Sequence, residues 1–433
     1  MVNSANLWHR LKECFFSNYE LDGLMNNAAP SIPETGSPKS RQLSERMIVM
    51  LIASIASFPA LSTDLYLPAL PTMSEQLNCS VPLVNLSLSV FFISISISSL
   101  FWGPLSDKYG RKRIMVIGIP LYVVSSFLCM VSQNVFQLIA ARMFQAIGAG
   151  AAMAVNMAVV KDVFPGRKRE RTFALVSMLT GVIPVIAPVI GAYVLKLTSW
   201  RGAFGVLTLI GAFVFVFSLF LKETSSERSD LNIFQTTSRL LVVLKNPNFV
   251  RLIIVFSVVS IPLLGFISVS SFIFINRFGV NEETFGLYFG SISILFIIGG
   301  PAYLFLQRRF KPLKIITVCY FGSLLSGILM LTIGQMGPIL FAVSIACGYI
   351  SVSISRPPAS SLLLEQHDKD TGSASALIQA SFLLTGSMGM QFVSSDWHNR
   401  IMVLGIMSFG LGLCGLALWF YTKTKCRIPK HFI

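Results

Sequence analysis

Hydrophobic and polar positions alternate along this chain in long blocks. After residue 46, twelve apolar stretches follow one another with short polar connectors between them. Each stretch is about as long as the roughly 20-residue helix that crosses a hydrocarbon core of about 30 Å. The pattern therefore predicts an all-α membrane protein with twelve transmembrane helices. The predicted spans are residues 47–67, 83–102, 114–132, 135–159, 172–195, 203–221, 252–275, 285–306, 315–333, 338–357, 373–394 and 401–421.

The twelve predicted spans fall into two sets of six. A longer basic connector at residues 223–251 separates a first six-helix bundle, residues 47–222, from a second, residues 252–422. Tails at residues 1–46 and 423–433 flank them. Many secondary transporters consist of two such pseudo-symmetric halves that rock about a site near the middle of the membrane.

Composition supports a membrane protein. Hydrophobic residues make up 54% of the chain and charged residues 12%, whereas soluble domains carry roughly 25% charged residues. This excludes a large water-soluble domain. The net charge of +15 does not indicate a nucleic-acid partner, because the basic residues lie in the connectors and not on one folded surface.

The distribution of basic residues predicts the orientation. Even-numbered connectors hold eighteen of them, and the opposite connectors only Lys196, Arg201, Arg277 and Arg400. Positive charge favours the cytoplasmic side. We therefore expect both termini in the cytoplasm, and no apolar core of a secretory signal precedes the first span. The eighteen are Lys108, Arg111, Lys112, Arg113, Lys161, Arg167, Lys168, Arg169, Arg171, Lys222, Arg228, Arg239, Lys245, Arg251, Arg308, Arg309, Lys311 and Lys314.

The residue types needed for cofactor or metal chemistry do not occur in the right spacing. The seven cysteines and four histidines show no metal-ligand pattern, and no phosphate-binding P-loop is present. We expect no metal, no cofactor and no enzymatic activity. Any uphill movement of a substrate would then draw on an ion gradient or a partner protein.

The connector after the second predicted span contains Gly103, Asp107, Gly110 and Arg111 within the run GPLSDKYGRKR. The glycines allow a tight turn, and an acid followed by four bases can form a latch with helix ends. A merely solvated basic loop is the alternative. The run resembles the loop signature of the major facilitator superfamily. That resemblance implies that Asp107 and Arg111 help to hold the cytoplasmic side closed in the outward-facing state.

The fourth predicted span carries Arg142 and Gln145 in the run RMFQAIG. It resembles the R-x-x-Q-G-x-G motif of the same superfamily, with Ala146 in place of the first glycine. An arginine inside the membrane is costly unless it is paired or wetted; the alternative is that it reaches the headgroups from a shallow position. The small residues at 148–154 predict close helix packing.

The fifth predicted span carries Gly181, Pro184, Pro188 and Gly191 at intervals that place all four on one helix face. Such a stripe allows another helix to approach and bends the span, and packing alone would account for it. The run TGVIPVIAPVIGAY also resembles the antiporter motif of drug:proton exporters in the superfamily, although Ala192 replaces a second glycine that is often seen there.

The end of the first predicted span, STDLYLPALP at residues 62–71, is similar to the S-x-D-x-Y-L-P-A-x-P signature of the Bcr/CflA branch of drug-resistance exporters. The resemblance covers about residues 45–422 and is stronger in the first half. One departure is Arg356, followed by two prolines, where relatives usually carry a small polar residue. Any substrate inherited from the branch is therefore in doubt.

The resemblance implies a major facilitator fold in a bacterial inner membrane. It also implies a monomer that exports small organic molecules in exchange for protons by alternating access, with the lipid bilayer as its surroundings. A dedicated exporter of an endogenous metabolite, such as a siderophore-like carboxylate, is one alternative. A membrane receptor or scaffold that transports nothing is another, from a different class.

Asp64 is the predicted proton carrier and Arg142 the residue that tunes it. Counting 1.5 Å per helical residue gives both residues comparable depths, and a carboxyl group between desolvation and a nearby arginine suits loading and release of a proton. Alternatively, Asp64 caps the helix end beside Pro68 or pairs permanently with Arg142. If Asp64 does not carry the proton, Glu365 is the next candidate.

Three further residues are candidate substrate contacts, namely Tyr66, Gln145 and Arg356. Arg356 lies in a bundle with few acids inside the membrane, and we expect it to attract an anionic or zwitterionic substrate. The alternative is that its side chain reaches the inner headgroups.

Overall fold

The computed structural model describes residues 44–224, 240–366 and 371–425. Within these ranges all regular secondary structure is helical. The predictions for residues 1–43, for 225–239 of the predicted linker and for 426–433 of the second tail lie outside the described residues.

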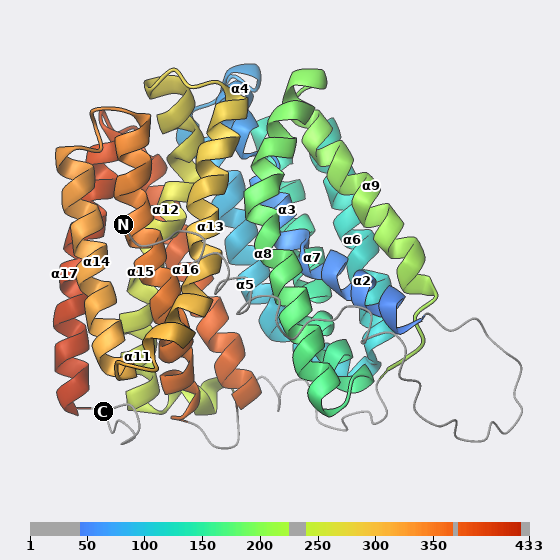
Figure 1. Cartoon of the computed structure of the whole chain (residues 1–433). Coiled ribbons are helices and arrows are strands. Elements are labelled where there is room, and N and C mark those ends of the chain that lie inside the picture. Colours follow the sequence, from blue (N-terminus) through green and yellow to red (C-terminus); the bar gives the residue numbers. More distant parts are fainter. Residues whose placement is uncertain (1–43, 225–239, 367–370, 426–433) are drawn as a thin grey trace, which may run out of the picture. The chain divides into compact units, whose positions relative to one another are not determined.

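The first half, residues 44–224, contains six spans when the bent pair is taken as one, and Figure 1 shows how they are arranged. A bent pair forms the first span, in which Glu45–Ala56 and Phe58–Gln76 meet at 42°. Phe58–Gln76 is itself interrupted. The helices are α2 Glu45–Ala56, α3 Phe58–Asp64, η1 Leu67–Ala69, α4 Leu70–Gln76, α5 Val81–Tyr109, α6 Arg111–Val131, α7 Val135–Val163, α8 Gly166–Leu197 and α9 Trp200–Leu219.

The second half, residues 240–425 without 367–370, contains the other six spans. Its helices are α11 Pro247–Val258, α12 Ser260–Ser271, η2 Phe272–Arg277, α13 Glu282–Leu306, α14 Pro312–Thr332, α15 Pro338–Leu364, α16 Thr371–Ser394 and α17 Arg400–Lys425. In the part of the chain that the structure describes, eleven helices are long and apolar enough to cross a membrane, and the bent pair makes twelve. The predicted fold class is confirmed.

Local sequence explains where several helices begin. Asn134 accepts a hydrogen bond from the backbone N–H of Gln137 at 2.9 Å, and Asn281 accepts one from Thr284 at 2.8 Å. Such side chains satisfy donors that the first turn of a helix leaves free. Large apolar side chains such as Leu197 remain exposed, as expected for helix faces in contact with lipid, where the helix satisfies its own backbone.

The spans have two ends, which we name by charge. The basic end holds the connectors at residues 110, 164–165 and 307–311, and the opposite end holds those at residues 77–80, 132–134 and 278–281. In Figure 1 the basic end is at the bottom. Several connectors, such as the one between α5 and α6, are shorter than the sequence predicts, because the helices extend beyond their apolar cores into polar sequence.

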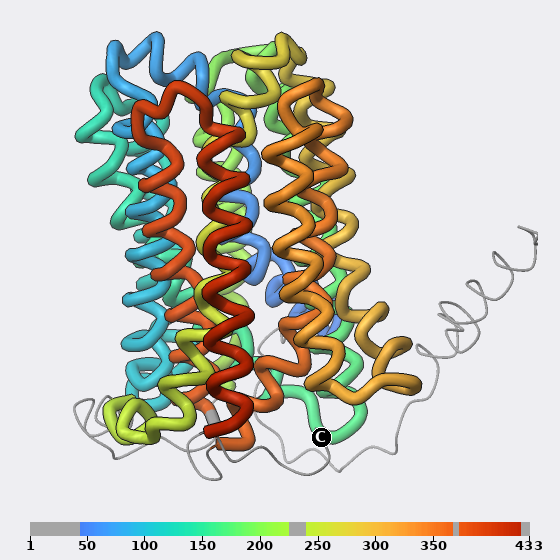
Figure 2. Tube along the Cα trace, turned by 90° about the vertical axis from the view of Figure 1, so that its left-hand side faces the viewer, coloured from blue at the N-terminus to red at the C-terminus, as the bar shows by residue number. Residues whose placement is uncertain are grey.

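The two halves meet along two helix pairs, α5 with α16 and α8 with α13. In the described residues, the hydrogen bonds between α5 and the second half lie between the opposite end of the molecule and the middle of α5. Asn85 donates to Ser394 at 2.9 Å, and Ser96 donates to the Ala380 carbonyl at 2.9 Å. Figure 2 shows the same helices from the side on which α17 lies. The halves are thus held together away from the basic end.

Candidate functional site

The first span is interrupted directly after Asp64, the last residue of α3. Tyr66 has φ −103° and ψ 0°, and the chain resumes as the short η1 helix. Pro68 lacks the N–H that would continue the hydrogen-bond ladder. Irregular backbone at membrane depth is tolerated where protein covers it, and here Gly191 of α8 lies directly against the Leu65 carbonyl.

Asp64 is buried, with 5% of its surface exposed, and it is the only buried carboxylate among the residues that the structure describes. Thr63 donates a hydrogen bond to its Oδ1 at 3.1 Å. No ion pair within 4.0 Å joins Asp64 to a basic side chain of the described chain. The structure therefore does not bring Asp64 and Arg142 into the pair that the sequence left open.

Arg142 is completely buried, so its side chain does not reach the headgroups. Its guanidinium lies over the ring of Phe91 at 4.1 Å, that of Tyr66 at 4.9 Å and that of Phe204 at 5.8 Å. Nη1 donates to Gln145 at 2.5 Å, and Nε has no hydrogen-bond partner among the residues that the structure describes. Aromatic faces attract a cation, and here they surround a charge without a carboxylate.

Hydrogen bonds through Gln145, Ser126 and Tyr122 connect Arg142 to the first span, with the backbone and the side chain of Tyr122 each making one of them. Gln145 donates to Ser126 at 2.7 Å, and Ser126 donates to the backbone carbonyl of Tyr122 at 2.7 Å. The Tyr122 hydroxyl bonds with Ser62 at 2.7 Å. The predicted residues Tyr66, Arg142 and Gln145 thus form one cluster, and Asp64 adjoins it only through neighbouring residues. Sequence gave no sign of Ser126 or Tyr122.

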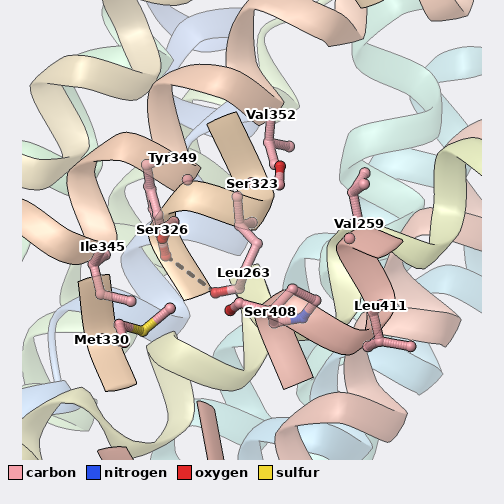
Figure 3. Close-up of a pocket in the computed structure, with 13 residues that line it drawn as sticks. Val259, Leu263, Ser323, Ser326, Met330, Ile345, Tyr349, Val352, Ser408 and Leu411 are labelled. Carbon is pink, nitrogen blue, oxygen red and sulfur yellow. Dashed lines mark hydrogen bonds between the residues drawn. The ribbon is translucent and has the colours of Figure 1, made fainter. Parts of the chain in front are cut away.

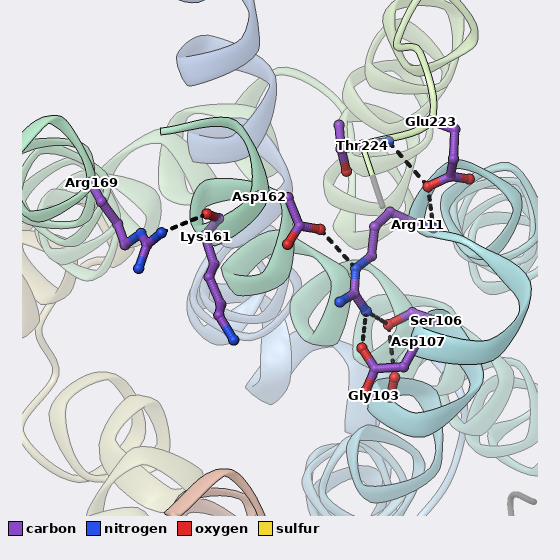
Figure 4. Close-up of polar contacts among 9 residues, drawn as sticks. All are labelled: Gly103, Ser106, Asp107, Arg111, Lys161, Asp162, Arg169, Glu223 and Thr224. Atoms are coloured by element: carbon purple, nitrogen blue, oxygen red, sulfur yellow. Dashed lines mark hydrogen bonds and ion pairs between the residues drawn. The ribbon is translucent and has the colours of Figure 1, made fainter. Parts of the chain in front are cut away.

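At the basic end, Arg111 holds three segments of the first half together (Figure 4). Its Nη1 lies 2.5 Å from Asp107, its Nε 3.1 Å from Asp162, and its backbone N–H donates to Glu223 at 2.8 Å. Asp162 and Glu223 were not predicted members. These partners all belong to the first half, so in this conformation the cluster ties first-half helices to one another.

The two glycines of this motif differ. Gly110 alone connects α5 to α6 and has φ +99°, a conformation that favours glycine. A Cβ there would also run into the Glu223 carboxylate. Gly103 lies inside α5, and a Cβ there would meet nothing within 4 Å. The expectation that both glycines form a tight turn is wrong for Gly103, because α5 continues as helix to Tyr109.

The stripe on α8 serves two contacts. Gly191 admits the Leu65 carbonyl, and Pro188 with Val189 lies against Gly286 of α13, where a Cβ would stand 3.0 Å from the Val189 Cα. Gly181 is less constrained, since its Cβ would meet Ile297 at an ordinary 3.6 Å. The helix runs unbroken from Gly166 to Leu197 through Pro184 and Pro188. Close approach is therefore needed at only part of the stripe.

Arg356 lies in the second half, away from this cluster. Its Nη2 donates to Gln379 at 3.4 Å, and its guanidinium faces the rings of Phe382 at 4.4 Å and Phe296 at 5.7 Å. A cavity of about 150 Å³ adjoins it. A separate pocket around Leu263, Ser326 and Tyr349 is mostly apolar and holds about 30 Å³ (Figure 3), the room of about one water molecule.

Comparison with known proteins places this architecture. The Major Facilitator Superfamily profile matches residues 51–390. An uncharacterized MFS-type transporter, YdgK of Bacillus subtilis (strain 168), is 29% identical over 395 residues, which are 89% of this chain and 97% of the relative. Multidrug resistance protein MdtL of Shigella flexneri serotype 5b (strain 8401) is 26% identical over 314 residues, 71% of this chain and 78% of the relative.

Among solved structures, a D-xylose-proton symporter superposes with a TM-score of 0.70 and 13% identity, covering 89% of this chain and 99% of that one. At this identity the likeness shows the fold alone. The profile match spans most of the chain and shows the family. The protein is a multi-pass membrane transporter, not an enzyme, and belongs to the Major Facilitator Superfamily.

Proposed function

We propose that this protein exports small organic molecules from a bacterial cytoplasm in exchange for protons, as a member of the Bcr/CflA branch. The similarity to a protein named for multidrug resistance supports export, and the antiporter-like run on α8 supports proton exchange. In this proposal the basic end faces the cytoplasm, in agreement with the positive-inside rule.

The observation that carries the proposal is Asp64 at the break of the first span. A buried carboxylate without a basic partner is costly, so the site favours a protonated group while it is closed. Opening of either end wets the break and allows the proton to leave. Arg142 lies near the same break, because its guanidinium carbon is 4.9 Å from the centre of the Tyr66 ring. Its positive charge favours the ionised form of Asp64 without forming an ion pair with it.

The test uses inverted membrane vesicles with an imposed pH gradient. Asp64→Asn should abolish gradient-driven accumulation of every toxic compound or secreted metabolite that the parent protein accumulates, and it should abolish substrate-induced proton release. Glu75→Gln is the matched control, because Glu75 lies on the same span and is exposed; it should leave both signals intact.

Three outcomes contradict parts of the proposal. Persistent pH-dependent accumulation in Asp64→Asn would move the proton site, with Glu365→Gln as the next variant. Accumulation that ignores the gradient would remove proton coupling. No accumulation of any toxic compound or secreted metabolite tested, with or without a gradient, would favour a receptor or scaffold.

A further inference from the structure

Arg356 borders a cavity between four helices of the second half, and both apolar and polar side chains line this cavity. Residues of α11, α14, α15 and α16 line its volume of about 150 Å³. Besides Arg356, the polar side chains of Ser355, Ser360, Ser375 and Gln379 face it. The cavity therefore combines a cation with hydroxyl and amide groups, a lining that suits a charged ligand.

Arg356 has no counter-ion in the described chain. No carboxylate of the described residues lies within 4.0 Å of it, and its one hydrogen bond to those residues is the long one to Gln379 at 3.4 Å. A guanidinium has five N–H donors and no acceptor. Most of these donors are thus available, and a half-buried cation in that state is stabilised by an anion that enters from outside.

The second cation inside the membrane provides the comparison. Arg142 also has no carboxylate partner in the described chain, but three aromatic rings and Gln145 surround it, none of its surface is exposed, and it does not line the Arg356 cavity. Aromatic rings cover only part of the Arg356 guanidinium, with the Phe382 ring at 4.4 Å, and the cavity adjoins the rest. Of the two arginines, Arg356 is the one that a ligand can reach.

The size of the cavity limits what enters it. About 150 Å³ corresponds to roughly five water molecules at about 30 Å³ each, and drug-sized pockets begin at about 300 Å³. A carboxylate or phosphate with a few further atoms fits, and the rest of a larger molecule would extend beyond it. The planar fork of arginine matches a carboxylate with two parallel hydrogen bonds.

Positive charge also lies at the far end of the same half. A hollow of about 440 Å³ at the opposite end is lined by Arg277, His398, Asn399 and Arg400 among others. Two of the four basic residues predicted for that side of the membrane therefore border one hollow. An anion that leaves Arg356 would meet favourable charge again at the other end.

We propose that the Arg356 cavity binds the anionic group of the transported molecule, so that substrates carry a carboxylate or a similar small acid. This inference rests on the proposed export function insofar as it says that the bound molecule is transported. It requires only Arg356 and its cavity for the binding of an anion.

The experiment measures binding to the purified full-length protein in nanodiscs of phosphatidylcholine, by thermal unfolding. Benzoate, citrate and inorganic phosphate are the anionic probes, and benzamide is the uncharged match of benzoate. At least one anion should stabilise the parent protein while benzamide does not, since a ligand that binds only the folded state raises its stability.

Four variants locate the site. Arg356→Gln should weaken anion binding about tenfold or more, because a charge-assisted hydrogen bond is lost. The affinity of Arg356→Lys should lie between those of the parent and Arg356→Gln, because lysine keeps the charge but not the planar fork. Gln379→Glu should also abolish binding while Arg356 remains, because it places a carboxylate where the amide now lies 3.4 Å away. Arg251→Gln, at an exposed arginine on α11, should bind like the parent.

The outcomes separate this inference from the proposed function. If no anion stabilises the parent more than benzamide, or if Arg356→Gln binds like the parent, the anion site is wrong even where gradient-driven export persists. If phosphatidylglycerol in the nanodisc stabilises the parent through Arg356 and the soluble anions do not, the cavity holds a lipid headgroup and the inference also fails. If anions bind but no export occurs under any gradient, the proposed function fails and the binding site stands.

Discussion

Replacement of Gly191 by alanine tests the packing of the broken first span. A Cβ at Gly191 would lie far inside van der Waals contact with the Leu65 carbonyl oxygen. The obstructing atom belongs to the backbone, so no side-chain rotation relieves the clash, and α8 must move away from the break after Asp64. Overpacking of this kind costs about 1–3 kcal/mol.

Gly181→Ala makes the same chemical change ten residues earlier on the same helix. Its Cβ would meet the Ile297 side chain at 3.6 Å, an ordinary contact. Alanine favours a helix over glycine by about 1 kcal/mol, so this variant should be as stable as the parent or slightly more stable. The helix preference is common to both variants, and only the clash separates them.

The assay is the free energy of unfolding of each purified variant in detergent, from a denaturant titration followed by tryptophan fluorescence. Gly191→Ala should be less stable than Gly181→Ala by the cost of the clash, about 1–3 kcal/mol. Equal stability of the two variants would refute the close contact between α8 and the break. Under the proposed function, Gly191→Ala should also export more slowly, because the break positions Asp64.

Three further predictions test other parts of the structure. Asp107→Asn should slow turnover with nearly normal protein levels, because this carboxylate is 48% exposed and exposed ion pairs contribute at most about 1 kcal/mol; normal transport would remove the latch role. Arg142→Met should unfold at the same temperature or higher yet lose export, since replacing a buried charge by an apolar side chain is often neutral or stabilising; a large loss of stability would contradict this. Gly290→Ala should destabilise the α8 and α13 contact, where the Val185 carbonyl lies 2.7 Å from a Cβ, whereas Gly300→Ala, with nothing within 4 Å, should not.

The spans are predictable from sequence because their length and hydropathy are local properties. The ends are less so. The predicted first span stops at residue 67, yet helix resumes after the break and continues to Gln76. The run from Gly103 to Tyr109 looks like a connector because it is polar, but it is the last part of α5. Helical hydrogen bonding does not stop where the apolar sequence stops.

The candidate site shows a second limit. Counting residues along a helix gives the depth of Asp64 and Arg142 but not the direction in which each side chain points, and the two form no pair. Likewise Asp162 and Glu223 lie 51 and 112 residues from Arg111, so only the fold reveals that they share it. Arg356 was identifiable as unusual, but its missing counter-ion and its cavity depend on four helices at once.

Only one residue, Gly110, separates α5 from α6, so we expect the movements of the two helices to be coupled. Consecutive Cα atoms lie about 3.8 Å apart, so Gly110 gives the joint almost no slack. α5 also lies along α16 of the other half. We therefore expect that a displacement of α16 moves α5 and, through Gly110, α6 as well, because no loop is present to absorb it. A few glycine and serine residues inserted after Gly110 would lengthen this connection and uncouple the movement of α6 from that of α5, without changing the charge of the protein.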